Sequence, residues 1–504
     1  MASQTRRYHG PMPMRIAFIA AECEPWAKTG GLGDVVDALA RSLARVPGAT
    51  DGLVDVFLPR YRSVPVPSTA GPAIPLRVPD PHSLDGAVEL TVINLEAAGY
   101  RLRLVDHPAA FDRDGLYGSP GGGDFGDNAW RFGLLSRAAL ETLRGERDRP
   151  VDVIHIHDWH ACPAPIYRDR WYEDDPVLGR AAVVLTLHNI AYHGWTPLDS
   201  LGQLGLAPGD GIVDADAVGI DLLASGIELA EVVNTVSPGY ARESLTPALG
   251  FGLDGALRAK GDRYLGILNG LDTEVWDPAT DADLAATYSA VDHRGKATCR
   301  ADLLNRVGFD STDDAPVLGM IGRLDPQKGF DLLADAASRL LSVGCRLIVL
   351  GSGDPRIAAD LRGLAERRPD RVALLERFDR AMARRIYAGV DFFLMPSRFE
   401  PCGQGQMIAL RYGTPPVVRR TGGLADSVVD ELRFPGEGTG FAFDAATPEA
   451  LAEACESAIA MRAAGGQAWA GLIARGMTVD FDWTTGPAPQ YVEMYERGIQ
   501  IRRR

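Results

Sequence analysis

Residues 397–406, with the sequence SRFEPCGQGQ, combine residue types that could bind an anion and stabilise positive charge. Gly403 and Gly405 allow the backbone to come close to a ligand. A helix expected to begin near Gln404 would point free N–H groups at the same place, which favours an anion such as phosphate. Glu400 would hold a carboxylate beside that anion, where it could stabilise positive charge that develops on a substrate. The competing interpretation is an ordinary surface turn.

The segments on either side are predicted to be a strand and a helix. Residues 391–395 (DFFLM) are apolar enough for a strand buried on both faces, and residues 407–412 (MIALRY) are typical of a helix. A strand, a turn and a helix in this order place the turn at the carboxyl end of a parallel sheet, where such folds bind ligands.

Lysine is rare in this chain, and two of its lysines stand in turns that contain glycine. Only four of the 52 basic residues are lysine, and Lys28 and Lys328 have such surroundings. A compact ammonium reaches a crowded phosphate or sugar oxygen that a planar guanidinium does not fit. We therefore expect both lysines to contact a ligand. The alternative is that they persist by chance in a chain biased toward arginine.

The turn of Lys28 is expected to be the first strand-to-helix turn of the chain. Residues 15–20 (RIAFIA) are typical of a buried strand, and a helix with one apolar face is predicted to start at Asp34. Between them, Gly30 and Gly31 would expose N–H groups to a phosphate or a sugar. The spacing matches neither a P-loop nor GxGxxG, which argues against ATP-driven and nicotinamide-dependent chemistry.

Polar and aromatic side chains follow two further predicted strands, residues 151–157 and 182–187. Sugar hydroxyls need hydrogen-bond donors and acceptors, and the apolar face of a sugar suits aromatic rings, so this composition favours a sugar pocket. His155 and His157 alternate with apolar residues and are expected to be structural. No metal site is predicted, because the histidines have no carboxylate or cysteine at ligand spacing. The residues expected in the pocket are Asp158, Trp159, His160, His188 and Tyr192.

A long loop is predicted to contain the three glycines of residues 121–123 and the polar pair Asp127 and Asn128, followed by Arg131 and Phe132. Long loops in compact domains are often functional, so this one is a candidate lid or acceptor-binding loop. A plain surface loop is an equally good interpretation.

Composition limits the partners and the compartment. A chain of 504 residues is too long for one core and predicts two or three domains. The net charge of −15 argues against nucleic acid or an anionic membrane as a partner. The six cysteines are widely spaced, no apolar run approaches a membrane span, and the N-terminus lacks the apolar core of a signal peptide. We therefore expect a cytoplasmic protein.

The C-terminal half repeats the strand, turn and helix scheme of the N-terminal half. Predicted strands at residues 316–322 and 346–350 each run into a turn that contains glycine. We therefore predict an α/β protein of two Rossmann-like domains that face each other across a cleft and bind the ligand there. The expected parts are a flexible tail at 1–13, an N-terminal domain at 14–268, a hinge near Asn269, a C-terminal domain at 272–480 and a final segment at 481–504.

Taken in order, these motifs resemble those of bacterial glycogen synthases and plant starch synthases, which are retaining glucosyltransferases of the GT-B type. The resemblance extends from about Arg15 to Tyr495. No single motif is specific, but the set is specific in this order. The motifs lie at residues 28–34, 157–161, 188–194, 269–270, 323–329, 398–403 and 421–424.

The resemblance implies transfer of glucose from a nucleotide sugar, usually ADP-glucose, to the non-reducing end of an α-1,4-glucan with retention and without a cofactor. It implies that Glu400 and His188 flank the anomeric carbon. Arg323 and Lys328 would bind the diphosphate, so that no metal is needed. The segment 481–504 would be a helix that crosses back to the N-terminal domain. The other implied donor-binding residues are Lys28, which is also a catalytic candidate, Gly30, Gly31, Asp34, Asn269, Phe378, Cys402, Gly403, Gln404 and Gly405.

Two departures from the family pattern concern the donor. Gln404-Gly405-Gln406 stands where Leu-Thr-Gln is usual. The turn is expected to tolerate this, because backbone N–H groups make the phosphate contacts, although a hydroxyl missing at Gly405 would weaken donor binding. Phe378 stands where the bacterial enzymes often have a tyrosine near the nucleotide, which leaves the base preference open.

Three alternative functions therefore remain. They are a glucosyltransferase that uses UDP-glucose, a catalytically silent glucan-binding paralogue, and a GT-B phosphorylase that would carry pyridoxal phosphate. The acceptor length and the oligomeric state stay open.

Overall fold

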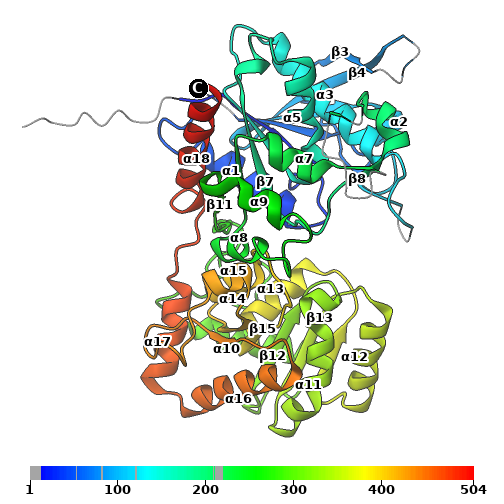
Figure 1. The fold of residues 1–504 in the computed structure, drawn as a ribbon. Coiled ribbons are helices and arrows are strands. Elements are labelled where there is room, and N and C mark those ends of the chain that lie inside the picture. The colour runs from blue at the N-terminus through cyan, green and yellow to red at the C-terminus, as the bar shows by residue number, and fades with distance from the viewer. Residues whose placement is uncertain are drawn as a thin grey trace, which may run out of the picture. The chain divides into compact units, whose positions relative to one another are not determined.

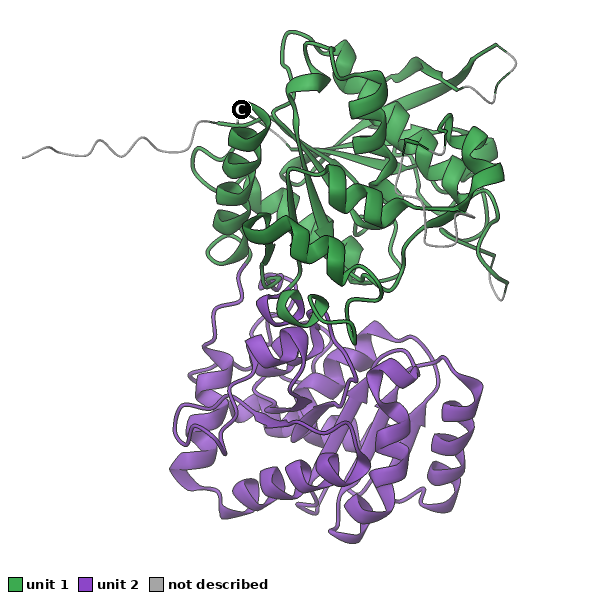
Figure 2. Ribbon diagram, in the orientation of Figure 1, with its two compact units in different colours: residues 1–236, 241–270, 483–504 green, residues 237–240, 271–482 purple. Residues whose placement is uncertain are grey.

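The computed structural model describes residues 13–50, 52, 54–80, 83, 85–119, 122–207, 209–210 and 219–504. The predicted tail, except Pro13, and Gly121 of the predicted loop lie outside these residues. The chain forms two compact units (Figure 2). Unit 1 comprises residues 1–236, 241–270 and 483–504, and unit 2 comprises residues 237–240 and 271–482. No helix in the described part of the chain is long and apolar enough to cross a membrane.

Unit 1 is built on a sheet that has nine strands among the described residues, in the order β11-β10-β7-β6-β1-β2-β5-β4-β3. Neighbours from β11 to β5 are parallel, whereas β4 pairs antiparallel with both β3 and β5. A separate antiparallel pair joins β8 and β9. The strands are β1 (Ile16–Ile19), β2 (Val54–Pro59), β3 (Ala73–Pro79), β4 (Ala87–Ala97), β5 (Tyr100–Asp106), β6 (Val153–His157), β7 (Ala182–Leu187), β8 (Trp195–Pro197), β9 (Gly219–Asp221), β10 (Val232–Thr235) and β11 (Tyr264–Gly266).

Helices flank this sheet (Figure 1). They are α1 (Gly31–Leu43), α2 (Pro108–Phe111), α3 (Asn128–Gly145), α4 (Asp158–Ala161), α5 (Pro163–Trp171), α6 (Leu201–Leu204), α7 (Leu222–Leu229), α9 (Asp254–Lys260) and α18 (Pro487–Arg502), while α8 (Pro238–Ser244) begins in the segment assigned to unit 2. Helix α1 starts at Gly31, three residues before the predicted start at Asp34.

The C-terminal helix α18 belongs to unit 1 and lies alongside α1 and β7 (Figure 1). Tyr495 is hydrogen-bonded through its hydroxyl to His155 Nδ1 at 2.8 Å, and Asn234 Nδ2 donates to the Tyr491 hydroxyl at 3.1 Å. These buried polar contacts orient the helix on the sheet, and they give His155 the structural role that its position in the strand predicted.

The predicted loop that contains Asp127 and Asn128 is shorter than expected. Asn128, Arg131 and Phe132 lie in the first turns of α3 rather than in a loop, and the helix is buried on all sides from residue 131 to residue 140. The buried Arg131 guanidinium donates to the carbonyl oxygen of Ala110 at 2.6 Å and to Asn128 Oδ1 at 2.6 Å. These side chains hold the helix in place, so the prediction of a lid extending to residue 132 is wrong.

Unit 2 is built on a parallel sheet in the order β14-β13-β12-β15-β16-β17. Its strands are β12 (Val317–Ile321), β13 (Arg346–Leu350), β14 (Val372–Leu375), β15 (Phe392–Met395), β16 (Pro416–Arg419) and β17 (Phe441–Phe443). Its helices are α10 (Arg294–Arg306), α11 (Phe330–Ser342), α12 (Pro355–Arg367), α13 (Arg380–Gly389), α14 (Gly405–Arg411), α15 (Gly422–Ser427), α16 (Pro448–Ala464) and α17 (Gly466–Met477).

The unit 2 sheet is covered on both faces. Leu318 and Met320 of β12 pack with α11, α12 and α16, whereas Val317 packs with α10 and α13 on the other face. This doubly wound arrangement confirms the predicted α/β class with two Rossmann-like domains.

In each unit the strand order reverses beside the first strand of the unit. The reversal lies between β1 and β6 in unit 1, and between β12 and β15 in unit 2. Doubly wound sheets bind ligands outside the carboxyl ends of the strands at such a reversal. The four turns that follow these strands are therefore where a site is expected.

Candidate functional site

The turns after β12 and β15 bring Lys328 and Glu400 together. The Glu400 side chain is 6% exposed, and its two oxygens accept hydrogen bonds from Lys328 Nζ at 2.8 and 2.6 Å. Ser397 Oγ donates to the same carboxylate at 3.0 Å. The carboxylate is therefore the buried half of an ion pair between two turns that are 72 residues apart.

Further contacts hold these two turns against each other. Gln327 Nε2 donates to the carbonyl oxygen of Phe399 at 3.3 Å. Gly329 has φ +78°, and a Cβ there would lie 2.3 Å from the carbonyl oxygen of Pro396. A residue with a side chain would therefore not allow the two backbones to approach this closely. The Lys328–Glu400 pair is thus held on a rigid support.

Arg398 ties the same turns together through its backbone and its side chain. Its N–H donates to the carbonyl oxygen of Gln327 at 2.8 Å, a contact between two backbones that does not depend on either side chain. Its guanidinium binds both oxygens of Asp331 at 2.8 and 2.6 Å. Arg398 therefore acts as a positioning residue within unit 2.

Arg323 and Phe378, by contrast, have exposed side chains that contribute little to the packing of unit 2. Arg323 is exposed, and its ion pair with Asp325 is long, at 3.4 Å. Phe378 is also exposed. These two side chains can therefore turn toward a ligand at little energetic cost.

Helix α14 begins at Gly405 with Gln404 as its N-cap, as predicted. A Cβ at Gly405 would lie 2.9 Å from Phe393 Cε1 and 3.3 Å from the Tyr387 hydroxyl. A side chain at this position would therefore point into the core beneath the helix, where the phenylalanine already fills the space. The glycine is explained by packing, whereas the effect of the missing hydroxyl on donor binding stays a prediction.

Gln406 is a residue of this turn to which the sequence assigned no role. Its amide nitrogen donates to the carbonyl oxygens of Cys402 and Gly403 at 3.1 and 3.0 Å, and to Ser427 Oγ at 2.9 Å. Cys402 is buried. Gln406 thus fixes the backbone between Glu400 and α14. The only sign of this role in the sequence was its position next to the predicted start of the helix.

In unit 1, the turn after β1 is organised by Glu22, which sequence reasoning missed. This buried carboxylate accepts hydrogen bonds from Thr29 N–H at 2.7 Å, Thr29 Oγ1 at 2.6 Å, Gly30 N–H at 3.0 Å and the Tyr117 hydroxyl at 2.6 Å. A buried acid three residues after a strand could have been noticed from the sequence. It sets the conformation of the segment that carries Lys28, Gly30 and Gly31.

Lys28 and Asp34 lie together at the start of α1. Lys28 Nζ donates to Asp34 Oδ1 at 2.5 Å and lies 3.7 Å from Glu24 Oε2. Both partners are partly exposed, so solvent screens the pair and a ligand can compete for either charge.

The turns after β6 and β7 bring Asp158 and His188 together. Asp158 has φ +53°, an unusual backbone conformation for a residue with a side chain, and its Oδ1 accepts a hydrogen bond from His188 N–H at 2.7 Å. His157 Nδ1 lies 3.1 Å from His188 Nε2, within hydrogen-bond distance. The strained backbone at a strand end, held by a specific contact, is typical of a functional site.

Burial sets the charge of this group. It raises the pKa of Asp158 to about 7, against the opposing effect of the backbone hydrogen bonds from His188 and Asn189. Burial also lowers the pKa of His188 and of His160 to about 3. Both imidazoles are therefore neutral near pH 7, where they can exchange hydrogen bonds with hydroxyl groups but carry no positive charge.

Four other predicted residues of unit 1, Trp159, His160, Asp127 and Asn128, contact neighbouring groups within the unit. The His160 ring stacks with Tyr117 and Trp159, at ring-centroid distances of 4.8 and 4.2 Å. Asp127 pairs with Arg113 at 2.7 Å. Asn128 donates to the carbonyl oxygen of Tyr117 at 2.8 Å.

Two predicted residues of unit 1 keep groups available for a ligand. Tyr192 is exposed. Asn269 is buried, and its Oδ1 has no hydrogen-bond partner in the described part of the chain. A buried amide oxygen of this kind usually has a partner, so Asn269 is a good candidate to receive a ligand hydroxyl. Within the described residues, no group of three or more His, Cys, Asp or Glu side chains is placed to hold a metal ion.

Two family models match the chain. Residues 15–259 match the family described as starch synthase catalytic domain, and residues 315–461 match glycosyl transferases group 1. The chain is 40% identical to the glycogen synthase of Koribacter versatilis over 97% of this chain and 99% of that protein. It is 42% identical to the glycogen synthase of Anaeromyxobacter sp. (strain Fw109-5), over 96% and 99% of the two chains.

Two solved structures are similar as well. The catalytic domain of starch synthase IV from Arabidopsis thaliana, bound to ADP and acarbose, is 33% identical with a TM-score of 0.86, covering 97% of this chain and 100% of that one. Sucrose-phosphate synthase from Thermosynechococcus elongatus, at 19% identity and a TM-score of 0.57 over 96% and 98% of the chains, shares the fold. By sequence and structure, the chain belongs to the glycogen synthase and starch synthase family of GT-B glycosyltransferases.

Proposed function

We propose that the chain transfers glucose from ADP-glucose to the non-reducing end of an α-1,4-glucan with retention of the anomeric configuration. The observation that carries the proposal is the buried Glu400 carboxylate, paired with Lys328 where the strand order of unit 2 reverses. Support for the ligands comes from the Arabidopsis starch synthase, which was solved with ADP and acarbose.

Lys328 and Arg323 are proposed to bind the diphosphate of the donor. An ammonium group has three N–H donors, and Lys328 directs two contacts at the oxygens of Glu400, which leaves one donor for a phosphate oxygen. Arg323 is exposed and can add a second, planar contact. Two positive groups would then oppose the negative charge that the leaving diphosphate acquires.

Glu400 is proposed to oppose the positive charge that develops on the glucosyl ring. Transfer of a glycosyl group passes through an oxocarbenium-like transition state, which a fixed carboxylate stabilises more than it stabilises the neutral ground state. The exposed Phe378 ring is proposed to stack on the nucleotide base, and the turn of Cys402, Gly403 and Gln404 to face the phosphates.

The residues of unit 1 are proposed to bind sugar. Lys28 and Asp34 would contact hydroxyl groups of the donor glucose, and the neutral His188 would exchange hydrogen bonds with the glucosyl group. Asn269 Oδ1, which lacks a partner among the described residues, would accept a further hydroxyl. Trp159 and Tyr192 offer aromatic faces to the glucan, as sugar sites commonly do.

A transfer assay tests the donor and the linkage together. The purified chain is incubated with glycogen and with radiolabelled ADP-glucose or UDP-glucose, and incorporation into the polymer is measured. β-Amylase, which removes maltose only from non-reducing ends joined by α-1,4 bonds, should release the label. Faster transfer from UDP-glucose would overturn the donor assignment. Transfer from neither donor would favour the silent paralogue, and label that β-amylase does not release would refute the proposed linkage.

A further inference from the structure

Unit 2 contains a cavity at the edge of its sheet where β15 begins, opposite to the edge at which Glu400 lies. It is a cavity of about 320 Å³ at the place where β15 begins, and its lining includes Asp391, the residue directly before that strand. The other end of β15 leads to the turn of Glu400. A strand of four residues is roughly 13 Å long, so the cavity is distinct from the proposed donor site.

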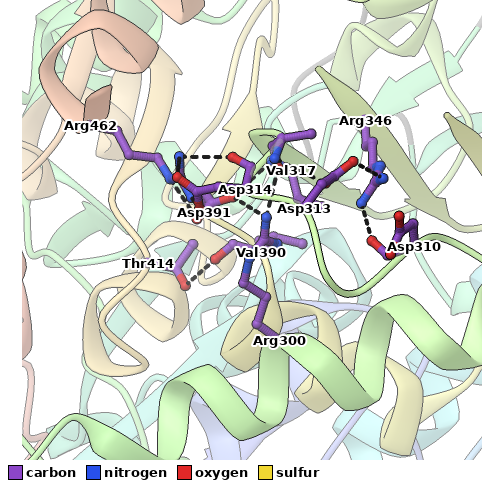
Figure 3. Close-up of polar contacts among 11 residues, drawn as sticks. Arg300, Asp310, Asp313, Asp314, Val317, Arg346, Val390, Asp391, Thr414 and Arg462 are labelled. Carbon is purple, nitrogen blue, oxygen red and sulfur yellow. Dashed lines mark hydrogen bonds and ion pairs between the residues drawn. The ribbon is translucent and has the colours of Figure 1, made fainter. Parts of the chain in front are cut away.

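Three cationic side chains and two carboxylates surround the cavity, namely Lys296, Arg300, Arg462, Asp314 and Asp391. Asp391 is already satisfied, because its Oδ1 accepts from Arg462 Nε at 2.9 Å and its Oδ2 accepts from the backbone N–H of Val317 at 2.8 Å. Arg462 also binds Asp314, whose side chain is 87% exposed and is therefore screened by water (Figure 3). The two carboxylates thus neutralise the charge of Arg462 more than the charges of Lys296 and Arg300.

Arg300 has an incomplete set of partners. Its Nη2 donates to the carbonyl oxygen of Ala315 at 2.7 Å and lies 3.6 Å from Asp391 Oδ2, which is too far for a strong contact (Figure 3). Its Nη1 is buried and has no hydrogen-bond partner in the described part of the chain. Buried donors in native proteins nearly always have a partner, and a cationic donor is best served by an anion.

Lys296 adds to the excess of positive charge. Its ammonium donates to the carbonyl oxygens of Ala388 and Tyr412, both at 3.0 Å, and to Thr414 Oγ1 at 2.6 Å. All three acceptors are neutral, and burial lowers the pKa of Lys296 to about 7. An anion in the cavity would favour the charged form of this lysine.

One wall of the cavity is apolar. Trp469 and Ile473 of α17 form part of it together with Val390, and the Trp469 ring packs edge-on against Phe392 with centroids 5.4 Å apart. Small-molecule sites combine such apolar surface with a few polar groups, and they begin at roughly 300 Å³. A ligand that fits both walls has one anionic group and a compact ring or apolar body.

We propose that this cavity is a second ligand site, which binds a small metabolite whose phosphate or carboxylate pairs with Arg300 and whose body lies against Trp469. The same anionic chemistry is present in a free inorganic anion, in a dicarboxylate and in a sugar phosphate. The wall formed by Trp469 favours an anion that carries a ring over a bare anion.

Calorimetric titration of the full chain tests the proposal, with saturating ADP present to occupy the donor site. The probes are glucose 6-phosphate, succinate, inorganic phosphate and uncharged glucose. We expect glucose 6-phosphate, which carries a ring beside its anionic group, to bind more tightly than succinate and inorganic phosphate, and glucose alone to add no binding at this site. Absence of binding by all three anions, or equal binding of glucose and glucose 6-phosphate, would overturn the proposal.

Two variants assign the binding to the cavity. Arg300→Gln removes the charged donor and should weaken anion binding about tenfold or more, the scale of one charged hydrogen bond. Arg306→Gln on the same helix is the matched control, because Arg306 pairs with Asp302 at 2.7 Å and does not line the cavity, so it should leave binding unchanged. Equal weakening by both variants, or by neither, would contradict the assignment.

A third variant acts in the opposite direction and does not depend on Arg300→Gln folding well. Asp314→Asn removes an exposed negative charge beside the cavity and frees Arg462 for a ligand, so anion binding should become several-fold tighter. Weaker or unchanged anion binding in Asp314→Asn would count against the site.

Discussion

The ion pair between Lys328 and Glu400 predicts that each residue supports both the fold and the reaction. Glu400 is 6% exposed and Lys328 is 28% exposed, with nitrogen–oxygen distances of 2.6 and 2.8 Å. Exposed pairs contribute about 0–1 kcal/mol, whereas removing one partner of a fully buried pair costs about 3–5 kcal/mol. Since one partner is buried and the other is partly hydrated, we expect each single variant to lose about 2 kcal/mol of unfolding free energy.

A double-mutant cycle measures the interaction itself. Glu400→Gln, Lys328→Met and the double variant are unfolded in urea and followed by circular dichroism, and the coupling energy should be about 1–2 kcal/mol. The exposed pair Arg339 and Glu456 of the same unit, at 2.7 Å, is the matched control, and its coupling should be clearly weaker because solvent screens it.

The same variants test the proposed roles in transfer. Glu400→Gln keeps the shape of the side chain but removes its charge, so kcat should fall by about 10²-fold or more. Lys328→Met should also raise KM for the donor. The reasoning is refuted if the Lys328–Glu400 coupling equals that of the exposed control pair while Glu400→Gln retains kcat within about tenfold of the wild type.

Three further predictions follow from the structure. Lowering the pH from about 7 to 5 should lower the melting temperature. His160 and His188 have pKa values of about 3 and stay neutral in the folded chain, whereas the same histidines take up protons below about pH 6.5 when the chain is unfolded. This difference should cost about 1.4 kcal/mol of unfolding free energy per histidine and pH unit. The pKa of Asp158, raised to about 7, has the opposite effect and offsets part of this loss, so a melting temperature that rises steadily toward pH 5 would contradict the assignment of neutral histidines. Gly405→Thr should destabilise the chain by about 1–3 kcal/mol, measured by urea titration, because its Cβ would meet Phe393. Adding Phe393→Leu should restore part of the lost stability. Full stability of the single variant would show that the space beside Gly405 is open. Glu22→Gln replaces an acceptor of four hydrogen bonds, so the melting temperature should fall and KM for the donor should rise. If both values are unchanged, the turn of Lys28 holds its shape without this carboxylate.

Several parts of the fold and the site could be predicted because they depend on neighbours in the sequence. The apolar run that became β15 and the start of α14 near Gln404 are determined by local pattern and turn chemistry. The antiparallel pairing of β4 with β3 and β5 was not predicted, because β3 is mostly exposed at the sheet edge and β4 is only partly buried, so neither has a long apolar run. The roles of the predicted site residues in binding and transfer remain predictions, which the variants above address.

The sequence by itself determined which turns follow buried strands, and therefore that Lys28, Asp158, Lys328 and Glu400 stand at strand ends. Only the tertiary structure decided which of these turns meet. The Lys328–Glu400 contact spans 72 residues and depends on β12 pairing with β15, and the contact of Tyr117 with Glu22 spans 95 residues. Such contacts depend on strand order, which is set by the packing of whole elements around a core, and no local pattern of residues encodes it.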